Sequence, residues 1–141
     1  MPPLTRWFIR TSFVYFFLAL LLGVLLGAQA VWDFSLPASA IDPSYFHLLA
    51  GGWITMLIIG VVFWMFPKYA LERPRRSLSL GWASYILLNV GLLLRIISEP
   101  ANAVIGTPAS IWAILLVLAA GLQWLGGMAF VINSWGRVKE K

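Results

Sequence analysis

Long apolar runs separated by short polar segments dominate the chain. Four runs occupy residues 11–31, 45–66, 78–97 and 111–133, and Arg95 is the only Lys, Arg, Asp or Glu within them. A bilayer core about 30 Å thick requires roughly 20 residues of α-helix, so each run is long enough to cross a membrane. No segment alternates with the period of two that is typical of a membrane β-barrel. The pattern predicts an all-α fold, an integral membrane four-helix bundle in one transmembrane domain over residues 1–141.

The segments between the runs contain signals for the start of a helix. Residues that are typical of an N-cap or a first helical turn stand shortly before the second, third and fourth runs. They are Asp42-Pro43, Ser77 and Thr107-Pro108. We therefore expect the three later helices to begin at these positions.

Composition narrows the class of protein. Of the 141 residues, 61% are hydrophobic and 11% are charged, whereas a soluble domain has about 25% charged residues. A soluble globule, a disordered chain and a nucleic-acid binder that works by charge are therefore excluded. The absence of cysteine excludes disulfides, iron–sulfur clusters, thiolate metal sites, covalent c-type haem and cysteine nucleophiles. No Ser-His-Asp set, paired carboxylates or phosphate loop is visible, so this chain alone has no complete catalytic site.

The positions of the basic residues predict the orientation in the membrane, because short basic loops remain on the cytoplasmic side. Asp33, Asp42 and Glu99 lie on the opposite side, together with Arg95. We therefore expect both termini to be cytoplasmic, in a multi-pass protein of the inner (plasma) membrane. Nine of the ten basic residues flank one side of the four runs: Arg6, Arg10, Lys68, Arg73, Arg75, Arg76, Arg137, Lys139 and Lys141.

The start of the chain imitates a secretory signal. Arg6 and Arg10 precede an apolar run that ends at Ala28-Gln29-Ala30, which has the form of a cleavage site. The apolar run has about 20 residues, however, whereas the apolar segment of a signal peptide has about 7–15 residues. We therefore interpret the first run as a retained helix.

Two ionisable residues within the runs are candidates for function, because a charge inside a membrane costs about 2.5–3.5 kcal/mol on insertion scales. His47 lies near the start of the second run, and Arg95 lies near the end of the third. At 1.5 Å per residue, both are expected within about one turn of the outer interface and therefore at the same depth.

His47 is open to two interpretations. Gly51, four residues later, would leave a flat hollow below the imidazole that a porphyrin edge or a neighbouring helix could occupy. Imidazole is the usual axial ligand of haem iron, which makes His47 the candidate metal ligand. Met56, Met65 and Met128 are candidate soft ligands, but none is positioned to complete a second axial bond at the depth of His47. Alternatively, His47 forms hydrogen bonds at the interface and binds no cofactor.

Arg95 is also open to two interpretations. Glu99 follows at i+4, so the two side chains can pair, and pairing lowers the cost of burying both charges. Alternatively, the planar guanidinium is offered to an anionic group such as a carboxylate at the outer face.

The segment 47–55 (HLLAGGWIT), which runs on to Gly60 and then 64–67 (WMFP), resembles the second transmembrane helix of the haem-copper oxidase and nitric oxide reductase catalytic subunit. In that family this helix begins near the outer face with a histidine that ligates the low-spin haem, and it ends at a proline on the inner side. The third run, from Gly81-Trp82 to Gly91 and Arg95, also resembles short proteins like oxidase subunit I. The similarity covers about residues 45–100.

The resemblance implies one site assignment. The family subunit has about twelve helices in three four-helix arcs, and this chain has the length of one arc without the histidines that hold copper and the high-spin haem. Reduction of oxygen or nitric oxide by this chain alone is therefore not expected. His47 is implied as an axial ligand of haem b, and Arg95 as a partner of a haem propionate.

Two hypotheses of function follow. The first is a haem-carrying or electron-transfer protein. Because the chain has a single histidine, a six-coordinate haem would need a second axial ligand from another subunit, such as His47 of a second copy in a homo-oligomer. Alternatively, a different protein offers that ligand, or the haem is five-coordinate and could bind a gas. The second is a non-catalytic scaffold or accessory subunit of a respiratory complex, packed through the glycines at 23, 27, 121, 126 and 127. A transporter is disfavoured because the second and third runs show no central charge or break.

Overall fold

A computed structural model describes residues 1–29, 31–32, 37–107 and 110–138. Every regular element in these ranges is helical, and α2, η1 and α3 follow one another without a break. Four continuous helices are therefore present, each long and apolar enough to cross a membrane, which confirms the prediction of an all-helical, multi-pass membrane protein. The elements are α1 (Pro3–Ala28), α2 (Ala38–His47), η1 (Leu48–Thr55), α3 (Met56–Met65), α4 (Leu78–Ile105) and α5 (Ile111–Trp135).

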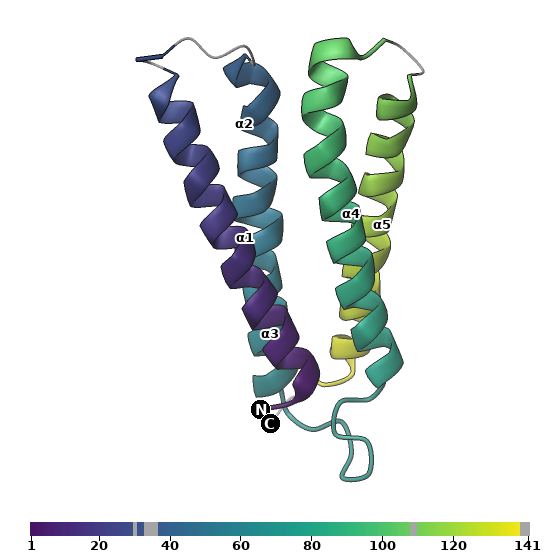
Figure 1. The fold of residues 1–141 in the computed structure, drawn as a ribbon. Coiled ribbons are helices and arrows are strands. Elements are labelled where there is room, and N and C mark those ends of the chain that lie inside the picture. The colour runs from purple at the N-terminus through teal and green to yellow at the C-terminus, as the bar shows by residue number, and fades with distance from the viewer. Residues whose placement is uncertain (30, 33–36, 108–109, 139–141) are drawn as a thin grey trace.

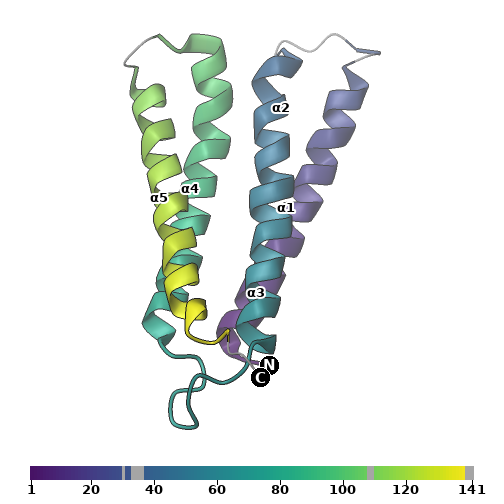
Figure 2. The same ribbon diagram turned by 180° about the vertical axis from the view of Figure 1, so that it is seen from behind.

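The helices form two antiparallel pairs, α1 beside the continuous helix α2–η1–α3, and α4 beside α5 (Figures 1 and 2). The pairs meet through α4, which packs against α2, η1 and α1, while α5 packs mainly along α4. Segment 66–77 joins the pairs at the end where α1 begins. The four helices therefore form an open bundle, in which much of α5 faces outward.

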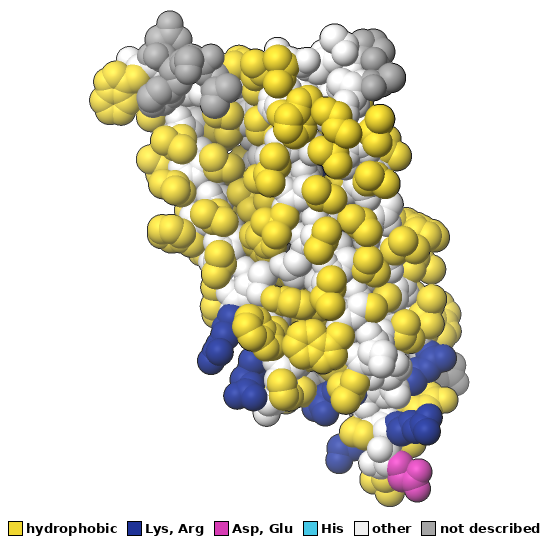
Figure 3. All heavy atoms as spheres, turned by 45° about the vertical axis from the view of Figure 1, so that its right-hand side comes forward, with side chains coloured by type: hydrophobic (Ala, Val, Ile, Leu, Met, Phe, Trp, Pro, Cys, Tyr) yellow, Lys and Arg dark blue, Asp and Glu magenta, His cyan; other side chains and the backbone are white. Residues whose placement is uncertain are grey.

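The surface separates into an apolar band and a charged end. On the face shown in Figure 3, hydrophobic side chains cover most of the length of the helices, and the Lys and Arg side chains gather at one end. We call this the basic end; α1 and α4 begin there, and α3 and α5 end there. Asp33, Lys139 and Lys141 lie outside the described residues. The described cations of the basic end are Arg6, Arg10, Lys68, Arg73, Arg75, Arg76 and Arg137.

The core lies between α1, the α2–η1–α3 helix and α4. Many other large apolar side chains are exposed, as expected where lipid rather than water surrounds the helices. The buried core cluster consists of Leu4, Phe8, Tyr15, Ala19, Leu48, Met56, Ile59, Phe63 and Leu92.

One of the three predicted helix starts is confirmed. Ser77 is the N-cap of α4, and its side chain accepts a hydrogen bond of 3.2 Å from the backbone N–H of Leu80. The start at Asp42-Pro43 is wrong, because α2 begins at Ala38 after the extended Pro37 and contains Pro43 within its length.

The start at Thr107-Pro108 is wrong as well. Ser110 is the N-cap of α5 and accepts a hydrogen bond of 3.3 Å from the backbone N–H of Ala113. Pro108 lies outside the described residues. Ser110 stands three residues before that donor, and this spacing lets a serine side chain cap the helix that starts after it.

The helix of the third run continues well past the end of the apolar stretch at Ile97. Helix α4 includes Glu99 and Pro100 and ends at Ile105. Proline lacks an N–H group, so Pro100 leaves the carbonyl of Ile96 without its usual helical donor. The hydroxyl of Ser44 on α2 lies 3.5 Å from this carbonyl oxygen. The hydroxyl has one proton, which it shares between this carbonyl and Oε2 of Glu99, so it supplies part of the donor that the proline removes.

The second membrane-spanning helix contains a π-helical segment, η1, that the sequence did not reveal. Buried residues recur at intervals of four along this helix: Ala40, Ser44, Leu48, Gly52, Met56 and Gly60. In an α-helix of 3.6 residues per turn, an interval of four rotates by about 40° at each step. The wider turns of η1 counteract this rotation, so one face remains directed at α1 and α4.

We predict opposite effects of alanine at two adjacent glycines of η1. A Cβ at Gly52 would lie 2.7 Å from the Cβ of Tyr15, whereas a Cβ at Gly51 would meet only Leu92 at 3.7 Å. Gly52→Ala should lower the free energy of unfolding by about 1–3 kcal/mol through overpacking. Gly51→Ala is the matched control and should be neutral or stabilising by up to about 1 kcal/mol. Thermal unfolding in detergent measures both, and equal melting temperatures would contradict this packing.

Candidate functional site

The structure brings His47 and Arg95 together in one cluster of polar side chains. His47 is the last residue of α2, Arg95 and Glu99 lie one turn apart on α4, and Gln123 lies on α5. Ser44 adds a hydroxyl from the preceding turn of α2. We call these five residues the polar cluster; it joins three of the four membrane-spanning helices.

The hydrogen bonds of His47 fix the tautomer of its imidazole. Nδ1 lies 2.7 Å from the carbonyl oxygen of Pro43 and 3.1 Å from each carboxylate oxygen of Glu99. Because a carbonyl and a carboxylate both accept hydrogen bonds, Nδ1 must carry a proton that it donates to them. In a neutral imidazole the lone pair is then on Nε2. The His47 side chain is 35% exposed, so it lies partly outside the packed interior.

Glu99 is the centre of the cluster. Its carboxylate accepts a hydrogen bond of 2.8 Å from Nε of Arg95, and the Ser44 hydroxyl lies 3.4 Å from Oε2. Nη1 of Arg95 donates a further bond of 3.0 Å to Oε1 of Gln123 on α5. The predicted pairing of Arg95 with Glu99 is therefore confirmed. Because the Glu99 side chain is only 10% exposed, this pairing offsets much of the cost of keeping a charge away from water.

The cluster lies deeper along the helices than one turn from their ends. His47 is nine residues from Ala38 at the start of α2, and Arg95 is ten residues from Ile105 at the end of α4. These separations correspond to about 14–15 Å of helix. Both helices continue through prolines at which the apolar runs seemed to stop, so they extend beyond those runs. The position within about one turn of the outer interface stays a prediction. The equal depth of the two residues is confirmed by their shared bonds to Glu99.

The surroundings of His47 favour a ligand on its outer side rather than inside one copy of the chain. On the inner side, Leu48 is buried and the Gly52 backbone approaches Tyr15 so closely that no Cβ fits. Gly51 has open space apart from Leu92, so it keeps the helix surface one turn below His47 shallow. A porphyrin would therefore have to lie on the outward face near His47 and Gly51.

The donor set matches one axial bond to haem iron. A histidine that ligates a metal through Nε2 usually donates its Nδ1–H to a carbonyl or carboxylate, and both are present at His47. The described residues hold no group of three or more His, Asp or Glu that could bind a metal ion by themselves. His47 could therefore offer one imidazole ligand to a bound cofactor.

Arg95 is engaged within the protein. Its Nε and Nη1 atoms are bound to Glu99 and Gln123, so only Nη2 is left without an assigned partner for the predicted propionate contact. Its clearest role in this geometry is to hold the Glu99 carboxylate, which in turn orients His47. The sequence pointed to the Arg95–Glu99 pair, but it did not reveal that His47, Ser44 and Gln123 join it.

A second set of hydrogen bonds joins α1 to α4 closer to the basic end. The hydroxyl of Tyr15 donates to Oδ1 of Asn89, and the hydroxyls of Thr11 and Tyr85 lie 2.7 Å apart. The Asn89 amide in turn donates to the Tyr85 carbonyl. Polar side chains within the apolar runs, such as Asn89 and Gln123, thus form hydrogen bonds between helices.

The glycines that predicted helix contacts divide into two groups. Gly23 faces Tyr45 and Gly126 faces Leu88, so both allow close packing inside the bundle. Gly27, Gly121 and Gly127 have no other side chain or packed backbone within 4 Å of an added Cβ. These three leave smooth patches on the outer surface of the described chain.

Comparisons with family models, with curated proteins and with solved structures find no match to this chain. The resemblance to the oxidase subunit therefore remains a prediction.

We predict that the Glu99 carboxylate stabilises the packing of α2 on α4. Glu99→Gln keeps the shape of the side chain but removes the charge that faces Arg95, so the free energy of unfolding should fall by about 1–3 kcal/mol. Asp42→Asn, at an exposed position of α2, is the control with the same change of charge and should have little effect. Replacing Arg95 by Gln in the Glu99→Gln background should recover part of the loss. Equal unfolding temperatures for the two single variants would contradict this role of Glu99.

Proposed function

We propose that this chain is a haem b-binding integral membrane protein that serves in electron transfer or haem carriage. The observation that supports this most is the fixed imidazole of His47, whose Nδ1–H is held by the Pro43 carbonyl and the Glu99 carboxylate. This arrangement directs the proton to Nδ1 and reserves Nε2 for a ligand. Haem, when bound, supplies an iron centre that exchanges one electron.

The other residues of the site prepare His47 for this role. Glu99 accepts the Nδ1 proton as a hydrogen bond and raises the electron density of the imidazole, which strengthens it as a ligand. Arg95 and Ser44 hold Glu99 in place. Gly51 keeps the adjacent surface low enough for a flat ring. We assign Arg95 a second task, the contact with a propionate through its remaining Nη2.

A second copy of the chain is the source of the second axial ligand in this proposal. The bundle is open, and His47 lies partly exposed on it. A two-fold axis beside His47 would bring two imidazoles to opposite sides of one ring, since an isologous interface presents the same residue twice. We therefore propose a homo-oligomer, with a respiratory-chain protein as its electron partner.

We further propose that the basic end is cytoplasmic, in the plasma membrane. Support comes from the gathering of the described cations at the end where α1 begins and α5 ends. The polar cluster then lies in the half of the membrane nearer the outer surface. Electrons would enter or leave at that side.

His47→Ala should abolish haem binding while the protein remains folded. Purified wild-type protein, expressed with added haem, should show a Soret band and a reducible α band, and the Ala variant should lack both. Asn89→Ala removes an amide elsewhere on α4 and should keep the spectrum. Native mass spectrometry of the wild type should give one haem for two chains.

Two results would contradict the proposal in different ways. A normal spectrum in His47→Ala would mean that His47 is not the ligand. A wild-type protein that binds no added haem would favour the second candidate, a scaffold or accessory subunit. That candidate is supported by the outward patches at Gly27, Gly121 and Gly127, which suit close contact with other membrane helices.

A reporter fusion tests the orientation. An enzyme that is active only in the cytoplasm, fused after Lys141, should be active, because the basic loop and both ends are expected on that side. A second fusion in the segment that follows α1, at Val31, should be inactive. The reverse pattern would contradict the proposed topology.

A further inference from the structure

Arg137 is the most deeply buried charged residue at the basic end. It follows α5, is only 1% exposed, and donates hydrogen bonds of 3.2, 2.8 and 3.1 Å to the carbonyls of Phe63, Phe66 and Pro67. These carbonyls stand at the end of α3, so Arg137 ties the ends of α3 and α5 together. Part of the guanidinium is still free, because Nη1 is buried without a partner among the described residues.

A cavity of about 520 Å³ opens beside this guanidinium. Lys68, Arg75 and Arg137 line it, and no acidic residue is among the described side chains of its wall. The Nε atom of Arg75 is also buried without a partner in the described chain. Arg75 and Arg137 thus both line this cavity, and each has an N–H donor without a partner in the described chain. Guanidinium N–H groups are donors that suit a phosphate acceptor.

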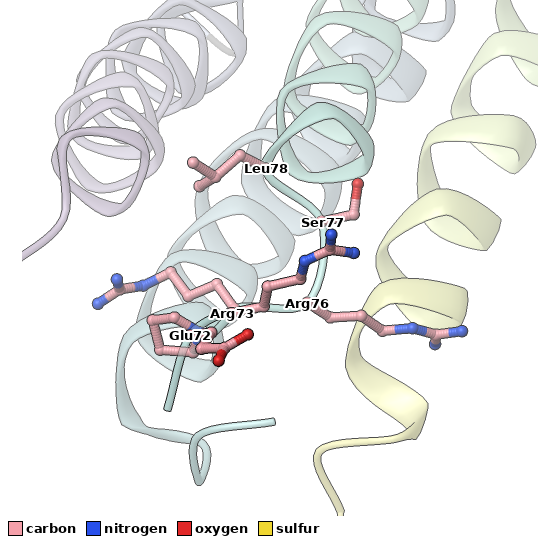
Figure 4. A pocket seen from close by; sticks show the side chains of 7 residues that line it. Glu72, Arg73, Arg76, Ser77 and Leu78 are labelled. Atoms are coloured by element: carbon pink, nitrogen blue, oxygen red, sulfur yellow. The ribbon is translucent and has the colours of Figure 1, made fainter. Parts of the chain in front are cut away.

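The neighbouring pocket has a different character. It is formed by segment 72–78, where Arg76 extends toward α5 and Arg73 points to the opposite side (Figure 4). Arg76 donates to the carbonyl of Ile132, and Glu72 is part of this pocket. Arg75 lines both pockets, but Glu72 belongs to the wall of this one and Arg137 does not. We therefore assign the anion site to the cavity that Arg75 and Arg137 share.

The charge of Arg137 is held at an electrostatic cost. Burial and, to a smaller extent, the nearby charge of Arg75 lower the pKa of Arg137. An anion in the cavity would reduce both effects, because it would solvate the buried guanidinium and separate two like charges.

We propose that this cavity binds the phosphate headgroup of an anionic phospholipid. The phosphate accepts from Arg75 and Arg137, and Lys68 adds attraction. A lipid is favoured over a free anion because Trp64 and Phe66 form the other side of the cavity at the end of an apolar helix, and Trp64 is 48% exposed. Aromatic side chains in this position mark the membrane interface, where headgroups lie beside acyl chains. The proposal is independent of haem binding.

The test compares the retention of lipid on detergent-purified protein by native mass spectrometry. The wild-type protein should retain more phosphatidylglycerol than phosphatidylcholine. Arg75→Gln should reduce the retention of phosphatidylglycerol by about fivefold or more, because one basic residue near a headgroup has an effect of this size. Arg73→Gln removes the same charge from the same segment but lies outside the cavity, so it should change retention by less than about twofold. Lys68→Gln provides a second variant of the cavity, with a smaller expected loss than Arg75→Gln.

Any of four results would overturn the proposal. Equal retention of the two lipids would exclude selectivity for an anionic headgroup. Equal losses in Arg73→Gln and Arg75→Gln would show that overall charge, rather than this cavity, attracts the lipid. Full displacement of phosphatidylglycerol by millimolar inorganic phosphate would identify a free anion as the ligand. If Arg75→Gln does not fold, retention that is unchanged in Lys68→Gln would likewise count against the site.

Discussion

The carboxylate of Glu99 holds together the part of the bundle that lies far from the basic end. Away from water, a charged or polar group is tolerated only when other groups of the protein satisfy it. Arg95, His47 and Ser44 all meet at Glu99, and Arg95 reaches on to Gln123. One acidic side chain thereby fixes the relation of α2 to α4 and, through Arg95, of α4 to α5.

The two helix pairs are joined at three levels. The polar cluster joins them farthest from the basic end, and the tyrosine contacts of α1 with α4 join them further along. At the basic end itself, Arg137 bonds to the end of α3. Apolar packing fills the space between these levels. Apolar side chains would find similar contacts with lipid tails, so apolar packing by itself gives little preference for one arrangement of the helices. The directional bonds are therefore what distinguishes this arrangement from other ways of placing four helices side by side.

Much of the fold could be predicted from the sequence, because span length and the placement of Lys and Arg are direct consequences of the bilayer. The start of α4 at Ser77 was predicted correctly, but other helix ends were not, because Pro43 and Pro100 look like boundaries in the sequence and lie inside α2 and α4. The contact of Ser44 with the Ile96 carbonyl, which accompanies Pro100, depends on tertiary packing. His47, Arg95 and their shared depth were predictable from the cost of burying polar groups. The bond of His47 to Glu99, 52 residues apart in sequence, depends on tertiary packing. Arg137 was predicted only as a topological charge, because nothing local reveals its burial.

The π-helical segment makes the second membrane-spanning helix sensitive to the number of its residues. Five steps of four residues separate Ala40 from Gly60, and a regular α-helix would rotate that series by about 200°. Losing one residue from η1 would turn everything before it by about 100° relative to α3. The imidazole would then face away from α4. Insertions and deletions should therefore be excluded between His47 and Gly60 in related chains, even where the residues themselves vary.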